Sequence, residues 1–241
     1  MKLEGFQFKI LFDMGVEDKM AKKITIPGEV IVSGNSYLPG EGTERRGEDV
    51  VALKYGLVEE SSKLVKIIPL SGVYIPRRGN VIIGKVENLT FNGWVIDIGT
   101  AGTAFLPVGE VPRYVNKNGL EEVMGIGDMM VSKIQEVNKR GVDLTIKSRG
   151  LGKLEDGIIV QVNSSKVPRL IGKEGSMINL IKDETNCNIT IGQNGFIWIK
   201  GDKIENELFA KKAILFVAEK SYIEGLTEET KKWFDKEKKN G

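Results

Sequence analysis

Glycine spacing is the feature that most limits what this chain can fold into. The 241 residues include 29 glycines, about 12%, against a usual ~7%. Glycine supplies the positive φ angles of tight turns and weakens helix and strand interiors, so this frequency favours many short strands over long helices. At ~100–200 residues per domain, the length allows one large domain or two to three small ones. With 41% hydrophobic residues, the chain can form packed cores.

The composition excludes several kinds of chemistry. The chain has no histidine, and Cys187 is its one cysteine. Ser-His-Asp and Cys-His catalysis, histidine metal sites, intrachain disulfides and four-thiolate zinc sites are therefore excluded. We predict no catalytic residues, no metal and no cofactor. A carboxylate enzyme that uses Asp97 or Asp128 as metal ligands is the rival interpretation, but no paired-carboxylate or phosphate-loop motif accompanies these residues.

The charge and hydropathy patterns bear on location and partners. No apolar run approaches the ~18 residues needed to cross a bilayer, and no signal-peptide pattern opens the chain. We expect a soluble cytoplasmic protein with no membrane contact. With 35 Lys and Arg against 33 Asp and Glu, the net charge is +2, so any binding of nucleic acid has to use local basic clusters.

Composition shifts divide the chain into four segments: 1–75, 76–150, 151–226 and 227–241. We predict a multi-domain protein, mainly β with an α+β part. The first segment is predicted to be a small all-β unit, and its polar stretch at residues 39–48 an exposed loop. Its strand patterns lie at residues 24–32, which Pro27-Gly28 interrupts, and at 49–57 and 64–70.

The second segment predicts a small barrel. Five strand-like stretches are separated by glycine turns, and closure into a barrel would remove their exposed edges. Residues 148–157 then form a predicted linker. The five stretches are residues 81–89, 94–98, 103–106, 130–137 and 142–147.

The third segment predicts the order β-α-α-β-β-α. A strand at 157–162 precedes two short helices within 166–184, and strands at 187–191 and 196–200 are joined by a Gln193-Asn194-Gly195 hairpin turn. A helix with apolar residues at helical spacing follows. The charged tail is predicted to be an exposed helix with Thr227 as its N-cap.

A Gly-x-x-Gly sequence, Gly172-Lys173-Glu174-Gly175, joins the two short helices. Glycines allow close approach of a sugar-phosphate chain, and the following helix N-terminus offers free N–H groups. In this context the segment 157–222 resembles the KH domain, whose Gly-x-x-Gly loop clamps about four nucleotides of a single strand.

The resemblance implies roles for the residues of this loop. Gly172 and Gly175 would frame the clamp, Lys173 would contact phosphate, and Glu174 places a negative charge where family loops are basic. The further residues implied are Lys166 and Arg169, which would add positive charge, and Ile171, which would line the core or the groove floor. The alternative is a helix junction that needs two glycines only for its geometry.

The second segment is similar to the OB-fold RNA-binding domain of the S-one type, on its spaced glycines and the stretch Gly93-Trp94-Val95-Ile96-Asp97-Ile98-Gly99. Such barrels stack bases on exposed aromatic rings beside cationic side chains. Phe91 is the preferred stacking residue, Phe105 is expected in the core, and Trp94 fits either place. The candidate cations, each of which a solvated surface explains equally well, are Arg77, Arg78, Lys85, Lys139 and Arg140.

In its order of segments the chain is similar to the RNA-binding cap subunits of the archaeal RNA exosome. Residues 24–29, 37–40 and 72–76 carry this resemblance in and after the first segment. It implies a non-catalytic subunit of a trimeric cap, made of this chain alone or mixed with a related cap subunit. The cap sits on a six-membered phosphorolytic ring and docks mainly through the N-terminal unit. Such a cap captures single-stranded 3′ ends, with a preference for A-rich tails, and guides them to the pore. A free-standing RNA-binding regulator is the alternative.

Overall fold

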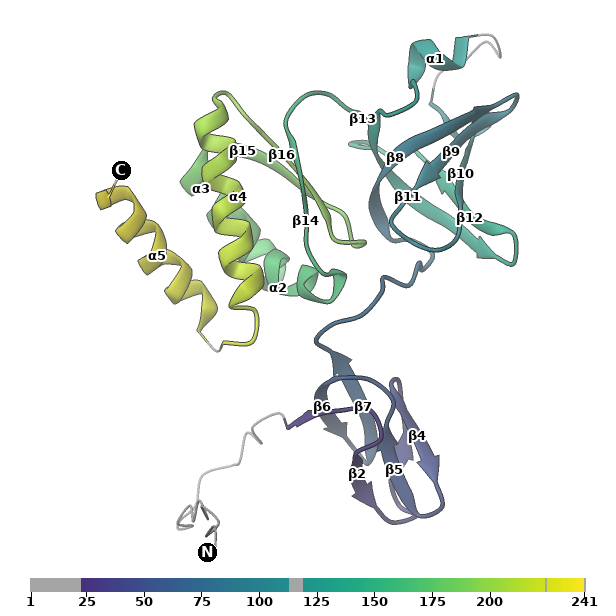
Figure 1. Cartoon of the computed structure of the whole chain (residues 1–241), viewed down its shortest axis with the longest axis vertical. Helices are drawn as coiled ribbons and strands as arrows, with labels where there is room; N and C mark the ends of the chain where they lie inside the picture. The colour runs from purple at the N-terminus through teal and green to yellow at the C-terminus, as the bar shows by residue number, and fades with distance from the viewer. Residues whose placement is uncertain (1–22, 113–118, 224, 241) are drawn as a thin grey trace, which may run out of the picture. The chain divides into compact units, whose positions relative to one another are not determined.

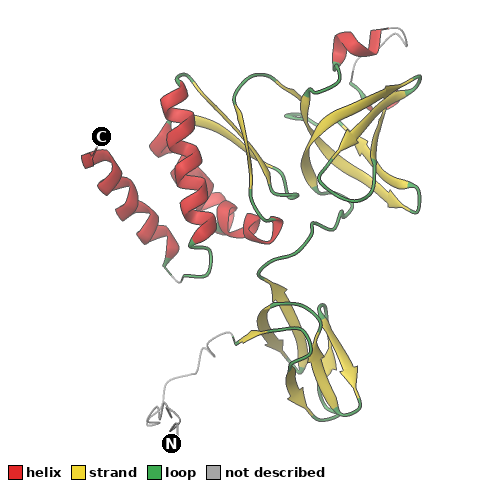
Figure 2. Cartoon of the chain, viewed as in Figure 1, coloured by secondary structure: helices red, strands yellow, loops and turns green. Residues whose placement is uncertain are grey.

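The computed structural model describes residues 23–112, 119–223 and 225–240, and the chain divides into two compact units, Met1–Ile68 and Pro69–Gly241. Within those ranges the first unit consists of β-strands, and the second combines a barrel with an α+β domain (Figures 1 and 2). This confirms the predicted fold class. None of the helices described is long and apolar enough to cross a membrane.

The first unit consists of short strands in two antiparallel-rich sheets, with the strand orders β1-β6-β7-β3 and β2-β5-β4. Its buried residues include Val50, Ala52 and Val65. The prediction that 39–48 is an exposed loop was wrong, because Thr43 is buried and its hydroxyl bonds the Val65 carbonyl at 3.0 Å. The strands are β1 Ile24–Thr25, β2 Val30–Ser33, β3 Leu38–Pro39, β4 Thr43–Arg46, β5 Asp49–Ala52, β6 Gly56–Ser61 and β7 Leu64–Pro69.

Strands β8 to β12 close into the predicted barrel. The sheet runs β12-β10-β9-β8-β11, and the pairing of β11 with β12 closes it. Alternate residues such as Ile82, Ile96 and Leu144 fill the interior. The elements are β8 Val81–Thr90, β9 Gly93–Asp97, β10 Ala104–Pro107, η1 Val108–Glu110, α1 Leu120–Val123, β11 Met129–Asn138 and β12 Gly141–Thr145.

The predicted linker after the barrel contains a further strand, β13 (Gly152–Leu154), which pairs antiparallel with β11. Lys153 Nζ lies 2.6 Å from the Asp128 carboxylate, so this short strand is tied to the barrel by an ion pair as well as by backbone bonds. The sequence did not predict β13 because its three residues show no hydrophobic pattern. The strand depends instead on pairing with β11, more than twenty residues earlier in the chain.

The order β-α-α-β-β-α is confirmed in the second part of this unit (Figure 1). The sheet order is β14-β16-β15, and residues such as Val160, Ile189 and Ile199 form one core with Leu170 and Ile214 of the helices. The elements are β14 Ile158–Gln161, η3 Ser164–Lys166, α2 Val167–Ile171, η4 Lys173–Gly175, α3 Ser176–Thr185, β15 Cys187–Ile191, β16 Phe196–Gly201 and α4 Ile204–Glu219.

The tail forms α5 (Leu226–Asn240), which packs beside α4 and is not the exposed helix that its charges predict. Phe234 is 1% exposed, and the Trp233 ring stacks on Phe209 and Phe216 with centroids 5.7 and 5.2 Å away. Thr227 lies within the helix, so it is not the N-cap. The apolar side chains recur at helical spacing among many lysines and glutamates, and one face of α5 is therefore buried.

Candidate nucleic-acid interface

The Gly-x-x-Gly loop lies between α2 and α3, and three of its four residues have positive φ angles. Gly172 has φ 74° and ψ 175°, Glu174 has φ 54° and Gly175 has φ 81°. Helix α3 begins directly afterwards at Ser176, and no side chain caps its N-terminus. The loop therefore presents the N–H groups and the positive end of a ten-residue helix, which attract an anion such as phosphate.

The two glycines of the loop are required for different reasons. A Cβ on Gly172 would lie 2.7 Å from the backbone nitrogen of Met177, so this glycine is required by packing. A Cβ on Gly175 would have its nearest neighbour at 3.6 Å, in the Asn179 side chain, so only the backbone conformation requires this glycine. The geometry of the helix junction thus explains why both positions are glycine. The Gly175 side of the loop also leaves space for a nucleic-acid strand to approach.

The side chains around the loop are mostly cationic and solvent-accessible. Arg169, Lys173 and Glu174 are exposed, and Lys166 and Ile171 are half-buried. The structure therefore places three cations and one anion on a single stretch of nine residues, 166–174. A surface of this sign fits the phosphates of a nucleic acid.

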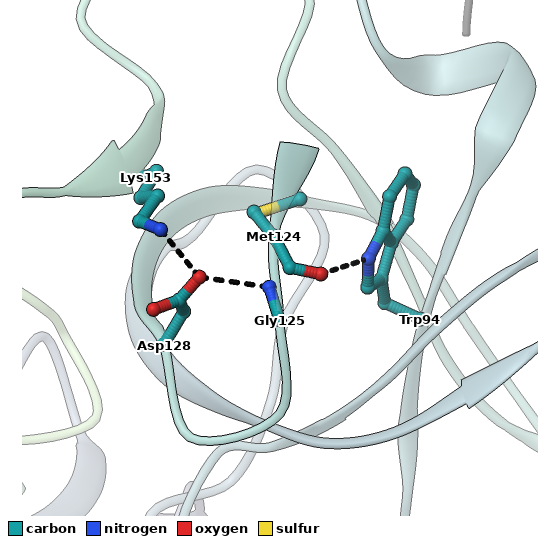
Figure 3. Close-up of polar contacts among 5 residues, drawn as sticks. All are labelled: Trp94, Met124, Gly125, Asp128 and Lys153. Atoms are coloured by element: carbon teal, nitrogen blue, oxygen red, sulfur yellow. Dashed lines mark hydrogen bonds and ion pairs between the residues drawn. The ribbon is translucent and has the colours of Figure 1, made fainter. Parts of the chain in front are cut away.

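In the barrel, Trp94 belongs to the core. It is fully buried, and its indole N–H donates a hydrogen bond to the Met124 carbonyl at 2.9 Å (Figure 3). The sequence allowed Trp94 to lie in the core or on the binding surface, and in the structure it lies in the core. The Trp94 ring therefore has no free face on which a base could stack. Phe91 is 81% exposed in the turn between β8 and β9, where a ring is free to stack.

The prediction that Phe105 lies in the core was wrong. Its neighbours Ala104 and Leu106 point into the barrel, and Phe105 is half-buried on the outside of β10. A Cβ on Gly93 would lie 2.9 Å from its Cζ, so the ring rests against a position where only glycine leaves room. Gly93 follows Phe91 by two residues, so the half-buried Phe105 ring and the exposed Phe91 ring belong to adjoining parts of the barrel surface. Strict alternation along β10 was the signal that could have found Phe105.

The candidate cations of the barrel are exposed, but they do not surround Phe91. Arg77 and Arg78 precede β8 and Phe91 follows it, at opposite ends of a ten-residue strand that spans ~30 Å at ~3.3 Å per residue. The pairing of Lys133 with Val81 places the β11–β12 turn, with Lys139 and Arg140, at the end where β8 starts. Lys85 lies between these ends and is exposed.

The hairpin turn between β15 and β16 binds the barrel, a contact that the sequence did not predict. The Gln193 N–H donates to the Val81 carbonyl at 2.8 Å, and the Val81 N–H donates to the Gln193 side-chain oxygen at 3.0 Å. The buried Asn194 amide donates to the carbonyls of Ile83 and Ile98 at 2.7 and 3.0 Å, and it accepts the Ile83 N–H at 3.2 Å. The hairpin turn thus bonds backbone groups of β8 that a neighbouring strand would otherwise bond. These hydrogen bonds join the α+β domain to the barrel.

Both carboxylates of the rival metal-site interpretation close turns. Asp97 accepts the Gly99 N–H at 2.8 Å. Asp128 accepts the Gly125 N–H at 2.8 Å and pairs with Lys153 (Figure 3), and the Lys153 ammonium is the main cause that lowers the pKa of Asp128. Within residues 23–112, 119–223 and 225–240, no three acidic or cysteine side chains gather as a metal site would need.

Comparisons with known proteins agree with this arrangement. The KH domain family matches residues 157–205. Exosome complex component Rrp4 of Methanothermobacter thermautotrophicus is 40% identical over 216 residues, which are 89% of this chain and 68% of that relative. Rrp4 of Methanothermus fervidus is 41% identical over 213 residues, 88% of this chain and 95% of the relative. A crystal structure described as a candidate exosome complex RNA-binding protein is 30% identical with a TM-score of 0.64, covering 70% of this chain and 98% of that one.

Proposed function

Since the chain belongs to the Rrp4 family of exosome complex components, we propose that it is a non-catalytic RNA-binding subunit of this RNA-degrading complex. The observation that carries the proposal is the joined pair of modules, a barrel with the exposed ring of Phe91 and a KH domain whose Gly-x-x-Gly loop follows the cations Lys166 and Arg169. Each module alone contacts only a short stretch of a single strand. Two joined modules act on one strand together, which raises the effective concentration at the second site.

The RNA ligand that we propose is a single-stranded 3′ region, with A-rich tails as the preferred class. Bases would stack on Phe91 and Phe105 of the barrel, and phosphates would meet Lys173 and Arg169 of the KH domain. The remaining cations, Lys166, Lys85, Arg77, Arg78, Lys139 and Arg140, would add attraction that is local and screened by salt.

We further propose that the N-terminal unit docks on a six-membered phosphorolytic ring and that three subunits form its cap, guiding RNA to the pore. Support comes from the apolar side chains that this small unit exposes, including Ile26, Leu38 and Leu53, since exposed apolar groups in such number are typical of contact surfaces. A free-standing RNA-binding regulator would carry the same RNA sites and would have no ring partner.

One experiment separates these two functions. The purified chain is mixed with archaeal exosome ring subunits, and the mass of the product is measured by size-exclusion chromatography with light scattering. We expect a complex with three copies of this chain on each ring, formed without RNA. If the chain and the ring elute separately at micromolar concentration, the regulator is the better assignment.

A second experiment tests the loop. Lys173→Asp combined with Glu174→Asp should weaken binding of a fluorescent oligoadenylate about tenfold at low salt, because a phosphate-facing cation is lost. Lys236→Asp on the exposed side of α5 makes the same charge change as a control and should leave the affinity unchanged. Equal affinities for all three proteins would reduce the loop to a structural helix junction. Degradation of the RNA by the purified chain would contradict the non-catalytic role.

A further inference from the structure

Helix α4 has three apolar faces, and one of them is uncovered. Ala210, Ile214 and Val217 face the core, and Phe209 and Phe216 are covered by Trp233 of α5. The third face carries Ile204, Leu208 and Leu215, which are 56%, 47% and 42% exposed. At 100° per residue these three positions fall within about 40° of one another, so they form one line along the helix. We call this line the α4 stripe.

The α4 stripe is not an ordinary scatter of surface residues. Among the described residues from 138 onward, the exposed large apolar side chains are the three of the stripe and Tyr222, which follows α4 directly. The domain's other large apolar side chains are buried or half-buried, and an exposed apolar line on one helix is typical of a protein contact surface.

Charges along the helix identify the kind of occupant. Exposed Glu205 lies at the start of the stripe, exposed Lys211 and Lys212 lie between Leu208 and Leu215, and exposed Glu219 lies one turn after Leu215. The order is therefore acidic, basic, acidic, with residue 212 at its midpoint. Lys203 and Lys220, just outside the helix ends, keep the pattern symmetric.

A second copy of the chain is disfavoured in the registers that place these like charges opposite one another. In an antiparallel pair centred on residue 212, Glu205 would face Glu219 of the other copy, and the lysines would face each other. A parallel pair also places like charges together at every level. Like charges at close range oppose association. RNA is disfavoured because Ile204, Leu208 and Leu215 offer no ring for base stacking.

We propose that the α4 stripe is a docking site for another protein that presents an amphipathic helix with acidic side chains at its centre and basic ones toward its ends. The apolar side chains of the partner pack on Leu208 and Leu215, and its central carboxylates pair with Lys211 and Lys212.

The test uses the full-length protein and two labelled peptides of about 18 residues, each with leucines at the stripe spacing. One peptide has glutamates in its middle and lysines toward its ends, and the other has these charges exchanged. Fluorescence anisotropy should show saturable binding of the acidic-centre peptide and at least tenfold weaker binding of the other. Equal binding of the two, or no binding at about 1 mM, would overturn the proposal.

Variants assign the binding to the stripe. Leu208→Gln with Leu215→Gln should weaken binding of the acidic-centre peptide at least tenfold, and Lys211→Glu with Lys212→Glu should reverse the preference between the peptides. Lys231→Glu with Lys232→Glu, an adjacent lysine pair on α5, is the matched control and should change neither affinity. If the glutamine variant fails to fold by circular dichroism, the charge reversal on exposed positions still decides.

Two outcomes would replace the proposed occupant. Concentration-dependent dimerisation of the wild-type chain that Leu208→Gln with Leu215→Gln abolishes would assign the stripe to a second copy. Loss of oligoadenylate binding in the same folded variant would assign it to RNA.

Discussion

The KH domain contains two Gly-x-x-Gly tetrapeptides, and the protein uses them in opposite ways. Gly172-Lys173-Glu174-Gly175 joins two helices and leaves its two charged side chains in solvent. Gly192-Gln193-Asn194-Gly195 joins two strands, and its two amide side chains bond the barrel. A glycine-bracketed turn allows another backbone to come close. In the first turn that place is open to a ligand, and in the second the chain's own β8 strand occupies it.

The middle residues explain this difference. Asn and Gln carry both a donor and an acceptor and can replace a strand partner, whereas Lys and Glu are costly to bury. Buried amides and exposed charges therefore make one turn a structural joint and the other a candidate binding loop. Four predictions test this contrast, from the largest expected effect to the smallest.

Asn194→Ala should lower the free energy of unfolding by about 4 kcal/mol, because it leaves the Ile83 N–H and the carbonyls of Ile83 and Ile98 buried without partners. Urea unfolding measures this loss. Lys173→Ala is the matched change in the other turn and should alter stability by less than about 0.5 kcal/mol. Similar losses for the two variants would contradict the contrast.

The two glycines of the exposed loop should also differ. Gly172→Ala should cost about 3 kcal/mol, since its φ and ψ are accessible essentially to glycine alone and the new Cβ would meet Met177. Gly175→Ala should cost about 1 kcal/mol, the strain of a left-handed residue in open space. Thermal unfolding of both variants checks the order, and a larger cost at Gly175 would show that this side of the loop is packed.

The barrel offers the same contrast between an exposed and a buried ring. Phe91→Ala should weaken oligoadenylate binding by about 1–3 kcal/mol, the usual value of one base stacked on an aromatic ring, and leave stability unchanged. Trp94→Leu should lower stability and act on RNA only through the fold, because the ring is buried and bonded to Met124. Anisotropy titrations and melting curves of both variants distinguish the two roles. Unchanged affinity in Phe91→Ala would remove this ring from the interface.

Low pH should affect only one of the two contacts that hold neighbouring segments to the barrel, the hairpin joint at Asn194 and the Asp128–Lys153 ion pair. The hairpin joint contains amides, which do not titrate, whereas Asp128–Lys153 depends on a carboxylate whose pKa is lowered. A lowered pKa means that the stabilisation is complete above the ordinary value of ~3.9 and is lost as the pH falls through the folded-state value. The wild type should lose about 0.5 kcal/mol more than Asp128→Asn between pH 7 and pH 3, since the pair is partly solvated. Parallel urea titrations that match at every pH would contradict this.

The order of elements was predictable from sequence because it depends on local patterns. Alternation and glycine turns located all five barrel strands, and the turn at Asn194-Gly195 located the β15–β16 hairpin. Strand β13 and the role of Asn194 were not predictable, because each depends on a partner far along the chain. Sequence spacing alone could not separate the two Gly-x-x-Gly turns, because both need positive φ angles and only the surroundings differ. For the same reason the predicted RNA-binding residues of the loop remain predictions.

The hairpin joint has a consequence for the newly made chain. Ile83 and its partner Val131 point outward from the barrel and are nonetheless buried. The Asn194 that bonds Ile83 is translated 111 residues later. Counted from Thr145, where the last barrel strand ends, Asn194 lies 49 residues on, which takes roughly 2 to 10 s at ~5–20 residues per second. During that interval the backbone groups of Ile83 have no hydrogen-bond partner and its apolar side chain is exposed. Binding by chaperones and misassembly therefore compete with docking of the α+β domain until that domain has been made.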